Sequence, residues 1–176
     1  MKIGLFYASS TCYTEMAAEK IQRQLGEELV ELHNIANESL ALTANYDVLI
    51  FGISTWDYGE LQEDWESQWA DVATLQLAGK IVALYGMGDQ EGYADWFQDA
   101  LGMLHEAIEH PEVARIGFWP NGDDYQFNAS KALTPDNSQF VGLALDDEGQ
   151  FERSDQRIED WCDQLLNELE SWAEQQ

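Results

Sequence analysis

Five short apolar runs, separated by stretches with helical periodicity, constrain the fold of this chain more than any other feature. The runs lie at Ile3–Tyr7, Leu29–Leu32, Val48–Ile53, Ile81–Tyr85 and Val113–Phe118. They lack the apolar–polar alternation of a strand with one face in water. We therefore expect strands that are covered on both faces, as in a parallel sheet.

Amphipathic stretches lie between these runs and predict helices. In Thr14–Leu25 the apolar residues recur at helical spacing, and Gly26 follows as a stop signal. We expect Ser154 to cap the last helix. The other expected helices are Glu63–Leu75, Trp96–Ile108 and about Asp155–Trp172. Strands that alternate with helices predict an α/β fold, a doubly wound five-stranded parallel sheet with helices on both faces.

One segment breaks this alternation. Between Trp119 and Gln139 lie Pro120, Pro135 and a run of turn residues with no helical period, and strand character resumes at Phe140–Leu145. We interpret residues 120–139, approximately, as an insertion inside or beside the fifth strand. The chain as a whole, residues 1–176, is then expected to form one domain.

The charge balance is strongly acidic. The chain has 34 Asp and Glu against 8 Lys and Arg, a formal net charge of −26. Such a surface repels nucleic acid and anionic membranes and attracts basic proteins, although acidity that serves only solubility is equally compatible. Two cysteines, Cys12 and Cys162, suit reduced thiols rather than a disulfide framework. With no signal peptide and no membrane span recognisable, we expect a cytoplasmic monomer.

A first candidate site follows the first apolar run. Ligands of open α/β sheets bind outside the carboxyl ends of the strands. Here the chain reads Ser9-Ser10-Thr11-Cys12-Tyr13-Thr14 and enters a helix. Hydroxyls and free backbone N–H groups at a helix N-terminus can bind an anion such as phosphate. The loop has no Lys or Arg, so a bound phosphate would keep its charge. Taken alone, the loop is more typical of an ordinary helix cap.

Two further loops carry aromatic residues at strand ends. They read Ser54-Thr55-Trp56-Asp57-Tyr58-Gly59-Glu60-Leu61 and Gly86-Met87-Gly88-Asp89-Gln90-Glu91-Gly92-Tyr93. Aromatic side chains at such positions need either a core or a planar ligand to cover them. The second loop is not a dinucleotide-binding fingerprint, because Glu91 takes the place of the third glycine. Together, the three loops predict a planar, phosphorylated cofactor.

Four motifs occur in order along nearly the whole chain. They are Ser9-x-Thr11-x-x-Thr14, Thr55-Trp56-x-x-Gly59-Glu60-Leu61, Gly88-Asp89-Gln90-x-Gly92-Tyr93 and Phe140-Val141-Gly142-Leu143-Ala144-Leu145-Asp146. With these motifs the chain resembles the long-chain flavodoxins, most closely the flavodoxin-2 type. The resemblance implies the flavodoxin-like strand order 2-1-3-4-5 with FMN at the switch point. It also accounts for the inserted segment, which separates long-chain from short-chain members.

The resemblance also implies roles for individual residues. Trp56 and Tyr93 would flank the isoalloxazine, and the Asp57–Tyr58 peptide carbonyl would accept the N5 proton of reduced flavin. Asp146 would lie at the ribityl side. The loop around the phosphate would comprise Ser9, Ser10, Thr11, Cys12, Tyr13 and Thr14. The remaining cofactor-binding positions would be Ser54, Thr55, Gly59, Gly88 and Asp89, with the loop at Asp89 facing the pyrimidine edge.

The chain departs from the family at a few of these positions. The family usually has glycine where this chain has Cys12, and often lysine where it has Tyr13. Cys12 is either a tolerated substitution or a reactive thiol, because a helix N-terminus lowers thiol pKa values. Asp57 and Tyr58 are bulky for a peptide that must rearrange on reduction.

These observations predict an FMN-binding electron carrier rather than an enzyme, since the chemistry needs no catalytic acid, base or nucleophile. The expected partners are redox proteins with basic surfaces, by resemblance an NADPH-dependent flavodoxin reductase as donor and iron–sulfur enzymes as acceptors. The alternatives are a flavin-dependent reductase of the quinone reductase kind and a non-redox interaction domain. The three histidines lack the spacing of metal ligands, and we expect no metal site.

Overall fold

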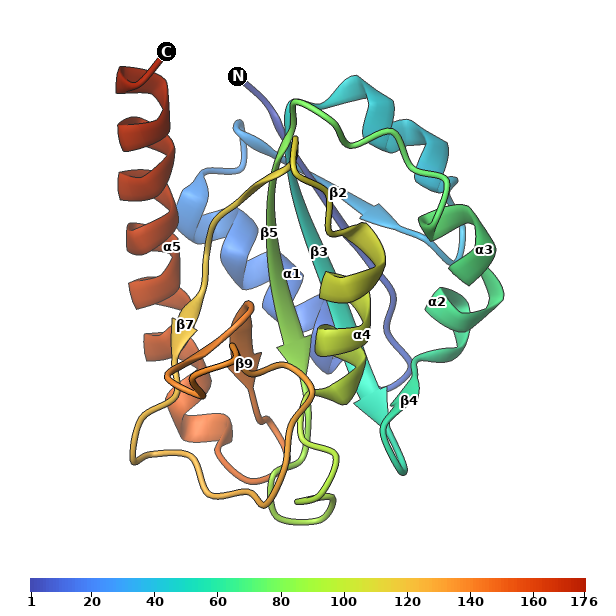
Figure 1. Cartoon of the computed structure of the whole chain (residues 1–176), viewed down its shortest axis with the longest axis vertical. Helices are drawn as coiled ribbons and strands as arrows, with labels where there is room; N and C mark the ends of the chain where they lie inside the picture. The colour runs from blue at the N-terminus through green and yellow to red at the C-terminus, as the bar shows by residue number, and fades with distance from the viewer.

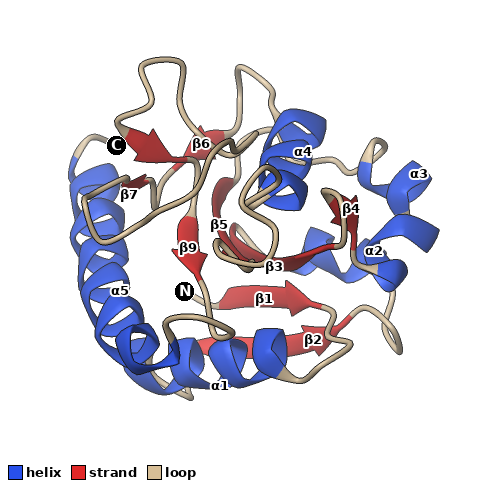
Figure 2. Cartoon of the chain, turned by 90° about the horizontal axis from the view of Figure 1, so that it is seen from below, coloured by secondary structure: helices blue, strands red, loops and turns tan.

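The computed structural model describes residues 1–176 (Figure 1) and contains a parallel sheet in the order β2-β1-β3-β5-β6 (Figure 2). The strands are β1 (Ile3–Tyr7), β2 (Val30–Asn34), β3 (Val48–Trp56), β5 (Ile81–Met87) and β6 (Ala114–Arg115). Ile3 pairs with Val48, Val48 with Ile81, and Ile81 with Ala114, so the strands begin level with one another. Their carboxyl ends therefore share one edge of the sheet. The predicted doubly wound sheet and its strand order are confirmed.

The fifth strand is split by the inserted segment, as the sequence predicts. Only β6 remains of the predicted strand Val113–Phe118, and β9 (Leu143–Leu145) resumes pairing with β5 farther along. Between them, β7 (Trp119–Pro120) and β8 (Gln139–Phe140) pair antiparallel and close the base of the insertion. The predicted strand Val113–Phe118 was too long, because the chain turns away at Gly117, whose φ of 79° is in the left-handed region.

Helix α1 matches its prediction closely, whereas the other three predicted helices begin or break elsewhere. The helices are α1 (Tyr13–Leu25), α2 (Glu63–Ser67), α3 (Trp69–Val72), α4 (Asp99–Ile108), α5 (Phe151–Glu174) and the 3₁₀ helix η1 (Leu40–Asn45). The predicted helix Glu63–Leu75 is broken at Gln68, whose side chain donates to the Ile35 carbonyl at 2.6 Å. Helix α4 begins three residues late because Gln98 is left-handed and buried.

Ser154 does not cap the last helix, so that prediction was wrong. Helix α5 begins at Phe151, and Ser154 lies inside its first turn, buried, with its hydroxyl donating to the Asp147 carboxylate. The hydroxyl thus ties the helix to the preceding loop. None of the helices combines the length and the apolar character that crossing a membrane requires.

Each face of the sheet has its own apolar core, and Figure 2 shows the two helical layers that cover them. Alternate residues of each strand point to opposite faces. On β1, Phe6 joins the core beneath α4, whereas Leu5 and Tyr7 join the core beneath α1 and α5. Both sets are apolar, which explains why the strands read as unbroken apolar runs.

Helix α4 packs directly on the inserted segment, and Gly102 makes this contact possible. A Cβ at this position would lie 2.2 Å from the carbonyl oxygen of Lys131. We expect Gly102→Ala to lower the free energy of unfolding by about 1–2 kcal/mol, because overpacking outweighs the ~1 kcal/mol gain in helix propensity. Urea unfolding measures this change.

The control is Glu106→Ala, at an exposed position of the same helix. It should change the free energy of unfolding by less than about 0.5 kcal/mol. An unchanged urea midpoint for Gly102→Ala would show that the inserted segment moves away from α4 at no cost.

Candidate functional site

A hollow of about 290 Å³ lies at the carboxyl edge of the sheet. It is bordered by the segments that follow β1, β3, β5 and β9. Its lining residues are Thr11, Tyr13, Thr14, Ser54, Thr55, Trp56, Asp57, Met87, Gly88, Asp89, Tyr93, Asp147 and Glu148. The sheet register therefore brings the three loops singled out in the sequence to one place.

Most of the predicted cofactor-binding residues line this hollow, but some do not. The predicted residues outside its lining are Ser9, Ser10, Cys12, Tyr58, Gly59 and Asp146. Three lining residues were missed by the sequence analysis, namely Met87, Asp147 and Glu148. Asp147 and Glu148 directly follow Asp146, so the acidic run at the end of an apolar stretch was the available signal.

The first loop ends at an open helix N-terminus. Met16 N–H donates to the Cys12 carbonyl at 2.8 Å, so the N–H groups of residues 13–15 have no partner within α1. The hydroxyl oxygen of Ser9 is buried and has no hydrogen-bond partner. A buried polar atom without a partner requires an explanation. Together with the free N–H groups, it fits an anionic group held at this end of the hollow.

Other contacts fix the shape of this loop. Cys12 has a φ of 71°, a left-handed conformation that explains why the family usually places glycine here. The Ser10 hydroxyl accepts from the side-chain amide of the buried Gln62 at 3.0 Å. The hydroxyl of the buried Tyr85 donates to the Thr14 carbonyl at 2.8 Å. The loop is therefore anchored from both β5 and the start of α2.

The loop after β3 forms a tight aromatic turn. Trp56 lines the hollow and donates from its indole N–H to the Ser54 hydroxyl at 2.9 Å. Asp57 has a φ of 45°, sparsely populated for a residue other than glycine. Tyr58 is 69% exposed and does not line the hollow; its ring lies 5.1 Å from that of Trp96 and 6.4 Å from that of Tyr93. The turn ends where β4 (Glu60–Leu61) pairs back with β3.

The loop after β5 supplies the second aromatic wall. Tyr93, 38% exposed, lines the hollow, and its backbone N–H donates to the Asp89 carbonyl at 3.0 Å. The Asp89 carboxylate accepts from the N–H groups of Glu91 and Gly92 at 3.2 and 2.8 Å. Asp89 therefore shapes this loop as well as lining the hollow.

The electrostatics of the hollow are wholly acidic. Its lining includes Asp57, Asp89, Asp147 and Glu148 and no Lys or Arg. Burial raises the pKa of Asp147 above its usual value, although the Ser154 hydroxyl and Lys20 oppose the shift. With no Lys or Arg in the lining, a negative group in this hollow would be held by hydrogen bonds and backbone dipoles.

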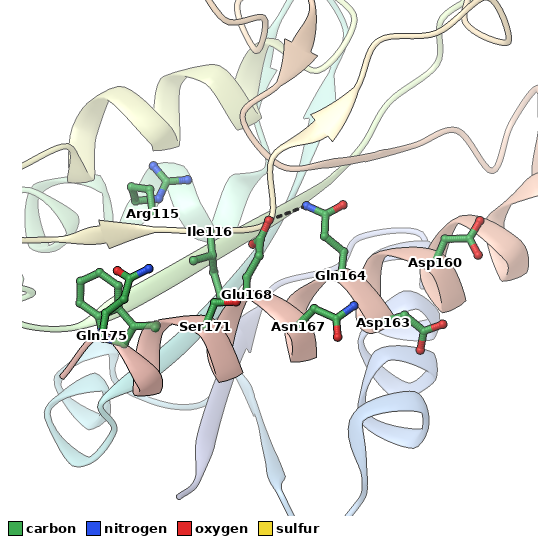
Figure 3. A pocket seen from close by; sticks show the side chains of 10 residues that line it. Arg115, Ile116, Asp160, Asp163, Gln164, Asn167, Glu168, Ser171 and Gln175 are labelled. Carbon is green, nitrogen blue, oxygen red and sulfur yellow. Dashed lines mark hydrogen bonds between the residues drawn. The ribbon is translucent and has the colours of Figure 1, made fainter.

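A larger hollow of about 640 Å³ lies between α5 and the segment at β6 (Figure 3). Its principal polar side chains already have partners. Gln164 donates to the Phe118 carbonyl at 2.7 Å and to Glu168 at 2.9 Å, and Glu168 accepts from the Gly117 N–H at 2.7 Å. These contacts hold the start of the insertion against α5, so we take the smaller hollow as the functional site.

The Flavodoxin family pattern matches residues 5–161. The chain belongs to the flavodoxin family. It is 57% identical over 169 residues to Flavodoxin 2 of Salmonella typhi, covering 96% of this chain and 97% of that protein. To a flavodoxin of Nostoc sp. it is 45% identical over 168 residues, with coverages of 96% and 97%.

The fold also matches a solved structure of the family. The flavodoxin of Fusobacterium nucleatum, bound to flavin mononucleotide, superposes with a TM-score of 0.85 and 27% sequence identity. The match covers 95% of this chain and 98% of that one. The resemblance identified from the sequence motifs is confirmed.

Asp99 lies behind the aromatic turn and supports it. Its Oδ1 accepts from the Lys131 N–H at 2.8 Å, and its Oδ2 lies against Gly59, where a Cβ would come within 2.8 Å. Burial raises the pKa of Asp99 above its usual value. The hydrogen bond from the Lys131 N–H and the positive charge of Lys131 lower this pKa, but by less. The folded state therefore holds the Asp99 proton more tightly than the unfolded chain does.

This shift predicts a pH-dependent effect of Asp99→Asn, which keeps the Oδ1 acceptor. Ionisation of Asp99 costs stability, and the cost grows as the pH rises from the usual Asp range through the raised pKa. The variant should therefore be more stable than the wild type near pH 7 and lose this advantage below pH ~4. Urea unfolding across this pH range measures the difference.

The control for overall charge is Asp71→Asn at an exposed position. It removes one negative charge without relieving a buried carboxylate. An equal gain in both variants would show that the effect comes from net charge and not from burial of Asp99.

Proposed function

We propose that this chain is one FMN-binding domain that carries single electrons between redox proteins in the cytoplasm. Membership of the flavodoxin family and the FMN named for the Fusobacterium nucleatum structure support this function. The observation that carries it is that one hollow is lined by residues of the α1 N-terminus, an anion seat formed by Thr11, Tyr13 and Thr14, and by two aromatic walls, Trp56 and Tyr93. The unpartnered Ser9 hydroxyl lies in the same first loop.

The residues of the hollow fit FMN from end to end. The Ser9 hydroxyl and the N–H groups of residues 13–15 would hold the phosphate. Trp56 and Tyr93 would flank the isoalloxazine. The ribityl side would be formed by Asp147 and Glu148, whereas the buried Asp146 would act from behind them. FMN, when bound, supplies the redox chemistry, and the protein tunes it.

Two features of the chain favour the transfer of one electron at low potential. Four carboxylates without a basic residue oppose any added negative charge in the hollow. Each ~1.4 kcal/mol of such opposition corresponds to roughly 59 mV for a one-electron couple. The Asp57–Tyr58 peptide lies in the strained turn, and its carbonyl would hold the proton at flavin N5.

The rim of the hollow suits partners with basic surfaces. The residues expected there are Asp57, Glu60, Glu63, Asp64, Glu66, Glu91 and Asp95. With a net charge of −26, the chain attracts such partners over a distance set by the salt concentration. An NADPH-dependent flavodoxin reductase as donor and iron–sulfur enzymes as acceptors fit this requirement. The chain would act as a monomer.

The first test removes both aromatic walls. We expect Trp56→Ala with Tyr93→Ala to raise the FMN dissociation constant roughly 100-fold, through lost stacking and lost apolar contact. Quenching of FMN fluorescence measures the affinity, and anaerobic potentiometry gives both one-electron midpoints. The control is Trp172→Ala on α5, with the same 38% exposure as Tyr93. Unchanged affinity and midpoints in the double variant would reject the proposed site.

The second test concerns the partner. Reduction by NADPH through a basic flavodoxin reductase should slow about tenfold or more as salt rises from 50 to 500 mM, because salt screens the attraction. The double variant Glu60→Gln/Glu63→Gln should flatten this dependence. A rate independent of salt would exclude the acidic docking mode. Rapid flavin reduction by NADPH alone would identify a flavin-dependent reductase instead.

A further inference from the structure

Gln90 is a buried polar residue at the junction of three loops. It lies in the loop after β5, between Asp89 and Tyr93 of the hollow, but does not itself line the hollow. Its side chain is 5% exposed. A buried amide is costly unless both of its ends are hydrogen-bonded. The contacts of this amide therefore show what it holds together.

Both ends of the Gln90 amide bond to other loops. Its Nε2 donates to Asp146 Oδ2 at 2.8 Å, and its Oε1 accepts from the backbone N–H of Gln126 at 2.6 Å. The Gln90 backbone N–H also reaches Asp146 Oδ2, at 3.3 Å. One side chain thus links the Tyr93 loop to the loop after β9 and to the inserted segment.

Asp146 connects Gln90 to the loop after β9, which forms another wall of the hollow. It is fully buried, and its Oδ1 accepts from the Gly149 N–H at 2.9 Å. Asp147 and Glu148, which lie between these two bonded residues, line the hollow. The Gln90 amide therefore connects two loops that border the hollow. One is its own loop, which carries Tyr93, and the other is the loop after β9 with Asp147 and Glu148, called the acidic loop below.

The other end of the link is firmly anchored. Tyr125, next to Gln126, is buried and donates to the Ala144 carbonyl at 2.6 Å. The Arg157 guanidinium lies 4.2 Å from the centre of the Tyr125 ring and pairs with Asp124 at 2.8 Å. Gln126 therefore presents its N–H from a fixed part of the insertion.

We propose that Gln90 is a positioning residue for the cofactor, whose amide sets the Tyr93 and Asp147 walls of the hollow against the inserted segment. The proposal rests on the FMN site proposed above. It gives the insertion a defined mechanical connection to the flavin, although the insertion itself contributes no lining residue.

The first variant is Gln90→Met, which keeps the length of the side chain and removes both hydrogen bonds. We expect the FMN dissociation constant to rise about tenfold and the two one-electron midpoints to move closer together, because the walls loosen and admit water. The matched control is Gln164→Met, which breaks comparable contacts on α5, away from the hollow. It should leave the affinity and both midpoints unchanged.

The second variant, Gln90→Glu, keeps the acceptor for Gln126 but sets a second carboxylate against Asp146. The surrounding charges are Asp89 and Glu91 on the same loop, Asp146, and the Asp124–Arg157 pair near Tyr125. The affinity lost at pH 8 should return on acidification, when the two carboxyls share one proton. A residue that merely fills space would give no such recovery.

Hydrogen exchange of the wild type completes the test. FMN should protect the backbone amide of Gln126, which does not border the hollow, and Gln90→Met should abolish this protection. Failure of the wild type to bind FMN would overturn the proposed function itself. If the wild type binds FMN and Gln90→Met matches it in affinity, midpoints and Gln126 exchange, the positioning role is excluded.

Discussion

The level register of β1, β3 and β5 is the constraint on which the site depends. Three parallel strands that begin together also deliver their loops to one edge, at heights set by strand length. β1 and β3 differ in length. β1 stops at Tyr7 and gives its loop to the start of α1, whereas β3 runs on to Trp56 and carries an aromatic ring farther out. The N-terminus of α1 and the ring of Trp56 thus lie at different depths of the same hollow. A ligand with a phosphate at one end and a ring at the other requires this arrangement.

The polar residues around the hollow explain how loops can be held in place without a basic residue. Buried side chains tie these loops to their neighbours: Gln62 donates to the Ser10 hydroxyl, Asp99 accepts from the Lys131 N–H of the inserted segment, and Asp146 accepts from the Gln90 amide and from the Gly149 N–H. Most of these groups are neutral amides or carboxylates that accept N–H bonds, so they add order without adding positive charge. A Lys or Arg in the same places would hold a phosphate more tightly, but it would also stabilise negative charge on the ring. The acidic lining and the amide-rich support therefore belong to one electrostatic arrangement.

The sequence predicted the parts of this structure that depend on local pattern. Apolar runs buried on both faces located β1, β3 and β5, and the strand-end rule located most lining residues. The errors arose where a distant contact overrides local preference. Gln68 breaks the helix predicted at 63–75 because its side-chain amide donates to the Ile35 carbonyl. Ser154 was predicted to cap the last helix, but its hydroxyl donates to the Asp147 carboxylate. The ribityl role of Asp146 stays a prediction: β9 ends at Leu145, Asp146 is buried, and Asp147 and Glu148 line the hollow. A shift of one or two residues at a strand end cannot be recovered from composition.

The inserted segment is tied to the site at more points than its position in the sequence suggests. After leaving the fifth strand, it runs beside the loop that carries Tyr93, where Asn128 and Ala129 donate to the Ala94 carbonyl at 2.8 and 3.1 Å. Phe97 N–H donates back to the Ala129 carbonyl at 3.2 Å. Backbone bonds of this kind depend little on side-chain identity, so the insertion can vary in sequence and still support the loop. The Gln90 amide is the exception, because it is a side chain that bonds to the insertion and to the acidic loop at once. A substitution of Gln90 therefore removes the contacts with both segments at once.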